Sequence, residues 1–209
     1  MSAPAAPEGY ATVNPFIITT DADELTRFVI EVFGGEERAE ARTIDEDGLL
    51  LQAEVRVGTS TIMLAERKPD WPFTPSLLQV YVDDLDAVLE RALARGARLV
   101  TKPTDFFGTQ FARVQDPSAN LWWIWQHGDT AWDVQDVQDG GDEWTSEGSD
   151  DGWGEVSPEL GYIHDTLLEA MAALSCAYAV AGVPKRMRFP SGSRTMNSLA
   201  PQGLTCSLS

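Results

Sequence analysis

Two stretches of the chain repeat the same succession of sequence signals, and this duplication limits the folds open to it. In each stretch, a run rich in β-branched and aromatic residues precedes an amphipathic helix pattern, and further strand-like runs follow. The aspartates at the start of the two helix patterns, Asp21 and Asp83, are 62 residues apart, and so are the glycines that end them, Gly34 and Gly96. A fixed internal period indicates two copies of one supersecondary unit.

Turn residues divide each copy into its expected elements. Strand-like runs occur at 10–19, 40–44, 49–57 and 60–66 in the first copy and at 77–82, 98–101, 109–115 and 121–126 in the second. The apolar helix stripes are Leu25, Phe28, Val29, Val32 and Phe33 in the first copy and Leu85, Val88, Leu89 and Ala92 in the second. We therefore expect an α+β protein built from two tandem βαβββ modules, at residues 10–67 and 77–127.

The remaining segments differ in composition from the modules. We expect a disordered N-terminus at 1–9, an acidic linker at 128–156, a C-terminal helix at 157–183 and an irregular basic tail at 184–209. The linker is rich in acidic residues, glycine and serine, which bury little surface. Ser157 and Pro158 suit the cap and first turn of the helix. Its expected apolar stripe is Leu160, Ile163, Leu167 and Met171.

The charge balance argues against several classes of partner. The chain has 15 Lys+Arg against 33 Asp+Glu, a formal net charge of −18, which opposes binding to nucleic acid or to an anionic membrane surface. The two cysteines, Cys176 and Cys206, are too few for a disulfide framework or a zinc site built from cysteines. The first residues lack a basic region followed by an apolar core, so we expect no secretory signal, no membrane span and a cytoplasmic protein.

Several short motifs mark the starts and ends of the expected elements. They are Asp21-Ala22-Asp23-Glu24-Leu25 and Phe33-Gly34-Gly35 in the first module, and Val82-Asp83-Asp84-Leu85, Gly96-Ala97 and Asp116-Pro117-Ser118-Ala119-Asn120-Leu121-Trp122 in the second. Together with the duplication, they resemble the vicinal oxygen chelate superfamily, which includes glyoxalase I, extradiol dioxygenases, fosfomycin-modifying enzymes and bleomycin-resistance proteins. The resemblance covers residues 10–127 and implies mixed sheets that curl into an open cup. The last motif looks like the family's Asp-Pro-x-Gly-Asn turn with Ala119 in place of glycine, so a positive φ there would disfavour the alanine.

Family members commonly hold a divalent metal at the base of the cup, on residues from four strands. Counted from the shared motifs, these positions are Asn14, Met63, Leu77 and Trp123. Such metals need oxygen or nitrogen ligands, which three of these side chains lack and a neutral asparagine supplies poorly. We therefore expect no metal, no other cofactor and no catalytic residue. One alternative is a site made by His127 with Glu54 and Glu66, the nearest carboxylates on strands.

Without a metal, the cup is expected to be a cavity for a ligand. Strand alternation places eight residues on its inner wall, and we expect them to bind the ligand: Asn14, Phe16, Met63, Leu77, Gln79, Tyr81, Trp123 and Trp125. The amide and hydroxyl groups could orient a small molecule, and the tryptophans could stack on a flat or cationic one. The same side chains could instead fill a core that plugs the cup.

These observations favour a metal-free small-molecule-binding protein that sequesters an antibiotic or a hydrophobic metabolite. They favour a binding protein over an enzyme. The alternative is a glyoxalase-like lyase, isomerase or dioxygenase with an atypical active site. A third interpretation is a scaffold whose acidic linker and C-terminal helix recruit a partner protein. Analogy at the level of the fold also predicts a homodimer, because exposed sheet edges are often completed by a second chain.

Overall fold

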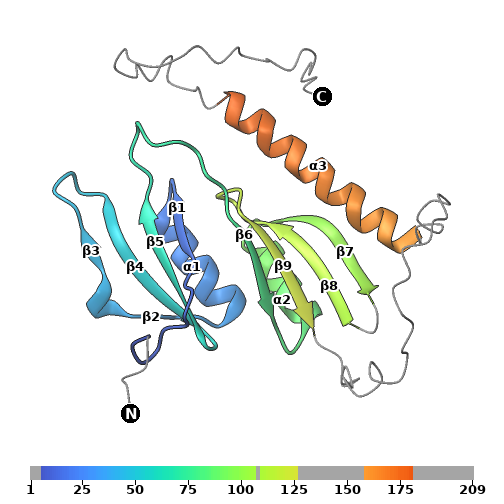
Figure 1. The fold of residues 1–209 in the computed structure, drawn as a ribbon, viewed down its shortest axis with the longest axis horizontal. Helices are drawn as coiled ribbons and strands as arrows, with labels where there is room; N and C mark the ends of the chain where they lie inside the picture. Colours follow the sequence, from blue (N-terminus) through green and yellow to red (C-terminus); the bar gives the residue numbers. More distant parts are fainter. Residues whose placement is uncertain (1–5, 107–108, 127–157, 181–209) are drawn as a thin grey trace, which may run out of the picture.

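The computed structural model describes residues 6–106, 109–126 and 158–180, which form two β-sheets and three α-helices (Figure 1). The first module contains β1 (Phe16–Thr19), α1 (Ala22–Phe33), β2 (Glu36–Glu37), the short 3-10 helix η1 (Ala39–Ala41), β3 (Thr43–Ile44), β4 (Leu50–Val57) and β5 (Ser60–Glu66). The second contains β6 (Leu77–Tyr81), α2 (Leu85–Ala94), β7 (Arg98–Phe106), β8 (Thr109–Gln115) and β9 (Leu121–Gln126), and α3 (Pro158–Val180) follows. The expected linker at 128–156 and basic tail at 184–209 lie outside the described residues.

The two modules have the same strand order. The first sheet runs β1-β5-β4-β2, with β3 paired to β4, and the second runs β6-β9-β8-β7. In both, the first strand of the module pairs in parallel with the last, and the other pairings are antiparallel. The sheets are not closed into a barrel. This arrangement confirms the duplicated βαβββ unit and the α+β class.

Each module helix is fixed at its start by an aspartate. The Asp21 side chain accepts a hydrogen bond from the Glu24 backbone N–H at 2.9 Å, and Gly34 ends α1 in the left-handed region with φ 69°. At α2 the capping residue is Asp84, which accepts from the Ala87 N–H at 2.9 Å. The two capping residues, Asp21 and Asp84, are therefore one residue further apart than Asp21 and Asp83, the aspartates that mark the repeat in the sequence.

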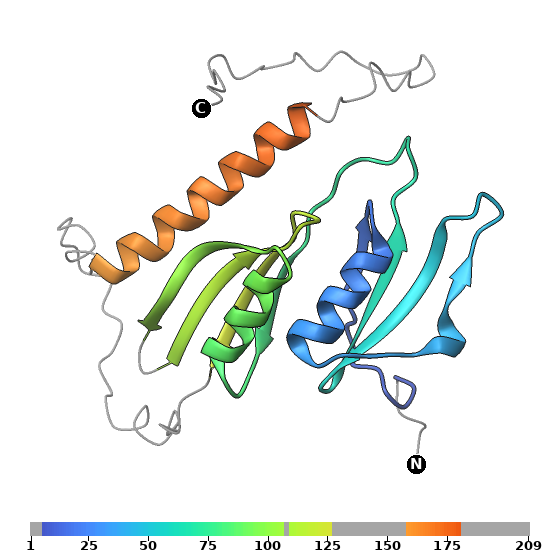
Figure 2. The same cartoon turned by 180° about the vertical axis from the view of Figure 1, so that it is seen from behind.

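Both module helices lie on the same side of the sheets and share one core. Figure 2 shows α1 and α2 in front of the two sheets, next to each other. The Phe33 ring of α1 lies 4.8 Å from the Trp122 ring of β9, so the first helix packs against the second sheet as well as its own. Alternate strand residues point into this core. We call the opposite side of each sheet, turned away from α1 and α2, its cup face.

The turn before β9 carries the expected departure from the family pattern. Ala119 has φ 71° and is the one non-glycine residue with a positive φ in the described part of the chain. The neighbouring Asp116 is buried, and its carboxylate accepts hydrogen bonds from the Asn120 backbone and side chain and from the Trp122 indole. Burial raises the pKa of the Asp116 carboxyl. These hydrogen bonds hold the turn in the conformation that gives Ala119 its unfavourable positive φ.

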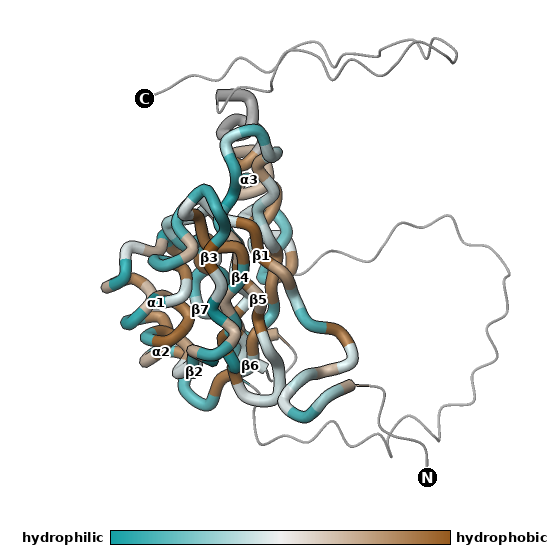
Figure 3. The backbone as a smooth tube through the Cα atoms, turned by 90° about the vertical axis from the view of Figure 1, so that its left-hand side faces the viewer, coloured by the Kyte–Doolittle hydropathy of each residue, from teal (hydrophilic) through white to brown (hydrophobic). Residues whose placement is uncertain are grey.

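Helix α3 lies on the cup face of the second sheet, at the end where β9 begins. Figure 3 shows it apart from α1 and α2. Ala170 and Leu174 are buried against Leu121 of β9. The expected stripe is thus partly wrong, because Leu160 and Met171 are exposed instead. No helix among the described residues has the length and apolar character needed to cross a bilayer.

Three strands differ by more than one residue from the sequence expectation. The strand expected at 10–19 is ordered as a strand only from Phe16, because the Asn14 side chain forms a turn with the backbone of Ala11. The strand expected at 40–44 is replaced by η1 and the two-residue β3. β7 continues past 101 to Phe106, with register shifts on either side of Thr101. Pro103 fits there because β7 is the edge strand of its sheet.

Candidate ligand-binding face

The cup face of the second sheet is covered by aromatic rings. Tyr81 on β6, Trp125 on β9 and Phe111 on β8 occupy adjacent register positions across three strands. The Phe111 and Trp125 rings stack with centroids 4.8 Å apart, and Phe106 meets them edge-on at 6.3 and 6.2 Å. Tyr81 is 65% exposed, so one end of this row faces solvent. Phe111 is only 1% exposed, so the apolar surface on which a ligand can stack lies toward the Tyr81 end of the row.

A second row on the same face combines polar and aromatic groups. Gln79, Trp123 and Arg113 are register neighbours on β6, β9 and β8. The Gln79 amide donates to the Tyr81 hydroxyl at 2.7 Å, which joins the two rows. The Arg113 guanidinium lies over the Trp123 ring, 4.2 Å from its centroid. This cation–π contact favours one orientation of the indole.

Arg113 is the buried charge of this face, with 2% of its surface exposed. Its Nη1 donates to the Thr101 hydroxyl at 3.2 Å and to the backbone carbonyl oxygen of Ile163 in α3 at 2.6 Å. Burial lowers the pKa of the Arg113 guanidinium, although arginine starts so far above neutral pH that it stays charged. Thr166 adds a hydroxyl contact to Thr101 at 2.8 Å. Arg113 therefore fastens α3 to the sheet beside Trp123.

The eight residues expected to bind a ligand fall into three places. Five lie together on the cup face of the second sheet: Leu77, Gln79, Tyr81, Trp123 and Trp125. Phe16 and Met63 are register neighbours on the cup face of the first sheet. Asn14 precedes β1, and its side chain is held by the backbone of Ala11. The second module therefore supplies one continuous face, to which Asn14 does not belong.

Three further residues of this face were not predicted from the sequence: Phe106, Phe111 and Arg113. The alternation along 109–115 does separate Phe111 and Arg113 from Ala112 and Val114, which are in the core. What the sequence lacked was the register that sets Phe111 against Trp125 and Arg113 against Trp123. That register depends on pairing between strands.

The residues at the family's metal positions do not fit a divalent ion. Met63 offers a soft thioether, and Leu77 and Trp123 offer no ligand atom suited to such a metal. The remaining position, Asn14, uses its side chain in the turn with Ala11. Across the described ranges, no group of three His, Cys, Asp or Glu residues is placed to hold a metal ion.

The two carboxylates considered as alternative ligands are both engaged in hydrogen bonds. Glu54 is 4% exposed, and it accepts from the Tyr10 hydroxyl at 2.6 Å and from the Gln52 amide at 2.8 Å. The hydrogen bond to Glu54 raises the pKa of the Tyr10 hydroxyl. Glu66 accepts from the Ala22 N–H at the start of α1, at 2.9 Å. The third candidate, His127, lies outside the described residues.

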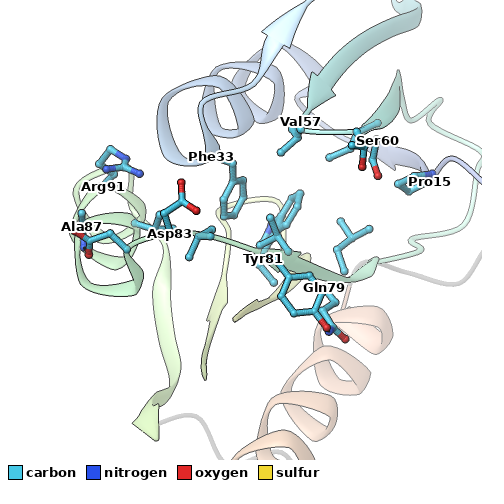
Figure 4. A pocket seen from close by; sticks show the side chains of 18 residues that line it. Pro15, Phe33, Val57, Ser60, Gln79, Tyr81, Asp83, Ala87 and Arg91 are labelled. Carbon is cyan, nitrogen blue, oxygen red and sulfur yellow. Dashed lines mark hydrogen bonds between the residues drawn. The ribbon is translucent and has the colours of Figure 1, made fainter. Parts of the chain in front are cut away.

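A groove of about 540 Å³ lies between the two modules (Figure 4). Its walls include Phe33, Val57, Ile62, Leu78, Val80 and Trp122, with Ser60, Gln79, Tyr81 and Asp83 also contributing. Figure 4 shows Gln79 on the other side of β6 from Phe33, so the groove meets the aromatic cup face along this strand. Its volume is within the range of small-molecule sites.

Comparison with known proteins agrees with the fold. The model of the Glyoxalase/Bleomycin resistance protein/Dioxygenase superfamily matches residues 10–124, both βαβββ modules. The chain belongs to this superfamily. An uncharacterised protein of Mycobacterium tuberculosis strain H37Rv is 29% identical over 126 residues, which cover 54% of this chain and 73% of that protein.

Several solved structures are similar to this chain at lower identity. TioX from Micromonospora sp. ML1 has a TM-score of 0.45 and 22% identity, covering 55% of this chain and 98% of its own. A glyoxalase/bleomycin resistance protein/dioxygenase family enzyme from Burkholderia phytofirmans has a TM-score of 0.45 and 22% identity, covering 58% and 98%. The fosfomycin resistance protein FosX from Listeria monocytogenes has a TM-score of 0.44 and 15% identity, covering 56% and 92%.

Proposed function

We propose that this protein binds a small molecule without a metal, on the aromatic cup face of its second sheet, and sequesters an antibiotic or a hydrophobic metabolite. The observation that carries the proposal is the row Tyr81, Trp125 and Phe111, whose rings cover a sheet face that remains open at Tyr81. Contiguous apolar surface that is left exposed to water often marks an interaction site. A stacked ligand would cover it.

The chemistry of the metal positions supports binding rather than metal-dependent catalysis. Leu77 and Trp123 stand at two of those positions and contribute apolar surface to the same face. An ion held there would have to be coordinated by groups other than the side chains at these positions. The protein is therefore proposed to retain the family's cup as a receptor and to use it for sequestration.

We further propose that the binding unit is a homodimer. Phe16 of β1 and Leu77 of β6 are both about half exposed on cup faces, at 49% and 50%. In the described part of the chain, β1 pairs only with β5 and β6 only with β9, so each has an unpaired edge. A second copy could cover these edges and apolar side chains. Sedimentation velocity tests this part of the proposal, which a monomer at micromolar concentration would contradict.

The proposal is tested by a thermal-shift screen of antibiotics and small aromatic metabolites on chelator-treated protein. A ligand that binds only the folded state raises the unfolding midpoint. Trp123→Ala and Gln79→Ala should each weaken a hit about tenfold or more, an order of magnitude typical of a lost stacking or hydrogen-bonding contact. Leu93→Ala, at an exposed position on α2, is the control and should leave the affinity unchanged. Unchanged affinity in both cup-face variants would contradict the assignment of the site.

A further inference from the structure

Three buried N–H donors on the cup face of the second sheet have no hydrogen-bond acceptor within the described structure. They are Nε of Arg113 and the indole Nε1 atoms of Trp123 and Trp125. Arg113 and Trp123 are cross-strand neighbours, and Trp125 lies two residues further along β9 on the same side. The three groups therefore form one donor-bearing patch inside the proposed ligand-binding face.

Buried polar groups in folded proteins nearly always have partners, so unmatched ones need an explanation. These three share one chemical character, because each can donate a hydrogen bond and none can accept one. A ligand that presents acceptor atoms would satisfy them. A ligand that presents an ammonium or other donor group would not.

The charge of the patch points in the same direction. Arg113 is 2% exposed, and no ion pair among the described residues includes it. Its Nη1 donates hydrogen bonds to two uncharged oxygens, the Thr101 hydroxyl and the Ile163 backbone carbonyl. A buried cation without a counter-charge is unfavourable, and an anion is the partner that removes the cost.

We propose that the ligand carries an oxyanion, such as a carboxylate, next to a flat apolar body. This inference rests on the proposed function and specifies its ligand class. The oxyanion accepts from Arg113 and from the Trp123 indole, and the apolar body stacks along Trp125 and Tyr81. The net charge of −18 would by itself favour a cationic ligand, but the buried charge of this face is positive. The charge of Arg113 outweighs the net charge of the chain in selecting the ligand, because it acts at contact distance in a site with little water.

Calorimetric titration of the full chain with three probes of the same ring system tests this inference. The probes are 1-naphthoate, 1-naphthamide and 1-naphthylmethylamine, which present an anion, a neutral amide and a cation. The expected result is that the wild-type protein binds naphthoate at least about tenfold tighter than naphthamide, with the amine weakest, as a charge-assisted bond outweighs a neutral one. Arg113→Gln should bring the affinity for naphthoate down to that for naphthamide.

Arg113 also fastens α3, so a second variant must leave that contact intact. Trp123→Phe keeps an aromatic ring under the guanidinium and removes the indole N–H together with the five-membered ring that carries it. The variant should lower the affinity for naphthoate several-fold and the affinity for naphthamide by less than about twofold. The amide is held mainly by stacking of its ring system along Trp125 and Tyr81. Lys102→Gln, which removes an exposed cation from β7 of the same sheet, is the control and should change neither.

The outcomes separate the inference from the proposed function. If naphthoate and naphthamide bind equally, or if Arg113→Gln and Trp123→Phe weaken both probes alike, the oxyanion is contradicted while binding at the aromatic face stands. If the amine binds tightest, the ligand class is reversed and the inference is wrong. If no probe binds and the screen of antibiotics and metabolites also gives no hit, both the inference and the proposed function are contradicted.

Discussion

The indole nitrogen of Trp122 donates a hydrogen bond to the buried carboxylate of Asp116 at 2.8 Å. Trp122 belongs to the core between the helices, whereas Asp116 closes the turn before β9. This bond ties the last turn of the second module to the core shared with the first. Since β9 carries Trp123 and Trp125 on its other side, the same turn also fixes where the aromatic cup face begins.

Replacement of Asp116 by asparagine tests the strength of this turn. The carboxylate accepts three hydrogen bonds, from the Asn120 backbone, the Asn120 amide and the Trp122 indole. An asparagine presents one NH₂ group in place of an accepting oxygen, so at least one donor loses its partner. Asp116→Asn should lower the free energy of unfolding by about 1–3 kcal/mol at pH 7. Urea denaturation measures this, and an unchanged midpoint would show that the network contributes little.

Ala119 is a site where a substitution should stabilise the protein. Its φ of 71° is easily adopted by glycine and disfavoured for alanine. Ala119→Gly should raise the free energy of unfolding by about 0.5–1 kcal/mol, the strain relieved less the added flexibility of the unfolded chain. Ser118→Gly in the same turn is the control, because Ser118 has no positive φ and should gain nothing. Thermal unfolding of both variants would distinguish them, and a loss of stability in Ala119→Gly would contradict the strain.

The pairing of Lys68 with Asp45 and Asp47 should make part of the stability depend on pH. Hydrogen bonds from Lys68 hold the pKa of both carboxyls below the usual aspartate value in the folded state. A lowered folded pKa contributes stability above the unfolded value, and this contribution is lost as the pH falls through the aspartate range, about 4 and below. Lys68→Gln should therefore have a lower unfolding midpoint than the wild type at pH 7, and the difference should shrink as the pH falls through the lowered folded pKa of the two carboxyls.

A constant difference between Lys68→Gln and the wild type across that range would contradict the assignment. Lys102→Gln removes a lysine that is not part of this cluster. It should show no such convergence, because its charge is exposed and screened by solvent.

Docking of α3 on the second sheet can be tested with two separate variants, one that places a carboxylate on the buried side of the helix and one that places it on the exposed side. Leu174 is buried against the sheet, whereas Leu168 is 53% exposed. Leu174→Asp buries an unpaired carboxylate and should release α3, which would speed hydrogen exchange of its backbone at least about tenfold. Leu168→Asp should leave exchange near the wild-type rate. Equal protection in the two variants would show that the helix is not held through this side.

The sequence alone was sufficient to predict the two repeated βαβββ modules. The helix stripes, the cap at Asp21 and the unfavourable φ at Ala119 follow from local patterns, and the structure confirms them. The side of α3 that docks could not be read in the same way, because this helix carries apolar residues on more than one side and a periodic pattern cannot choose between them. Contact with Leu121 makes that choice in the folded chain.

The candidate site was predictable only where strand alternation was enough. Gln79, Tyr81, Trp123 and Trp125 could be assigned to one face because β6 and β9 begin and end near the expected positions. Asn14 could not be placed, because a local turn with Ala11 competes with the strand. Arg113 was missed since its role depends on a helix that follows it by some fifty residues in the sequence.

The most direct test of the proposed function is the affinity of the strongest ligand from the screen, measured by calorimetry on chelator-treated protein and again after addition of zinc or manganese. We expect the same dissociation constant in both states, and a loss of affinity of about tenfold or more in Trp123→Ala. Binding that appears only after the metal is added, or that Trp123→Ala leaves unchanged, would contradict it.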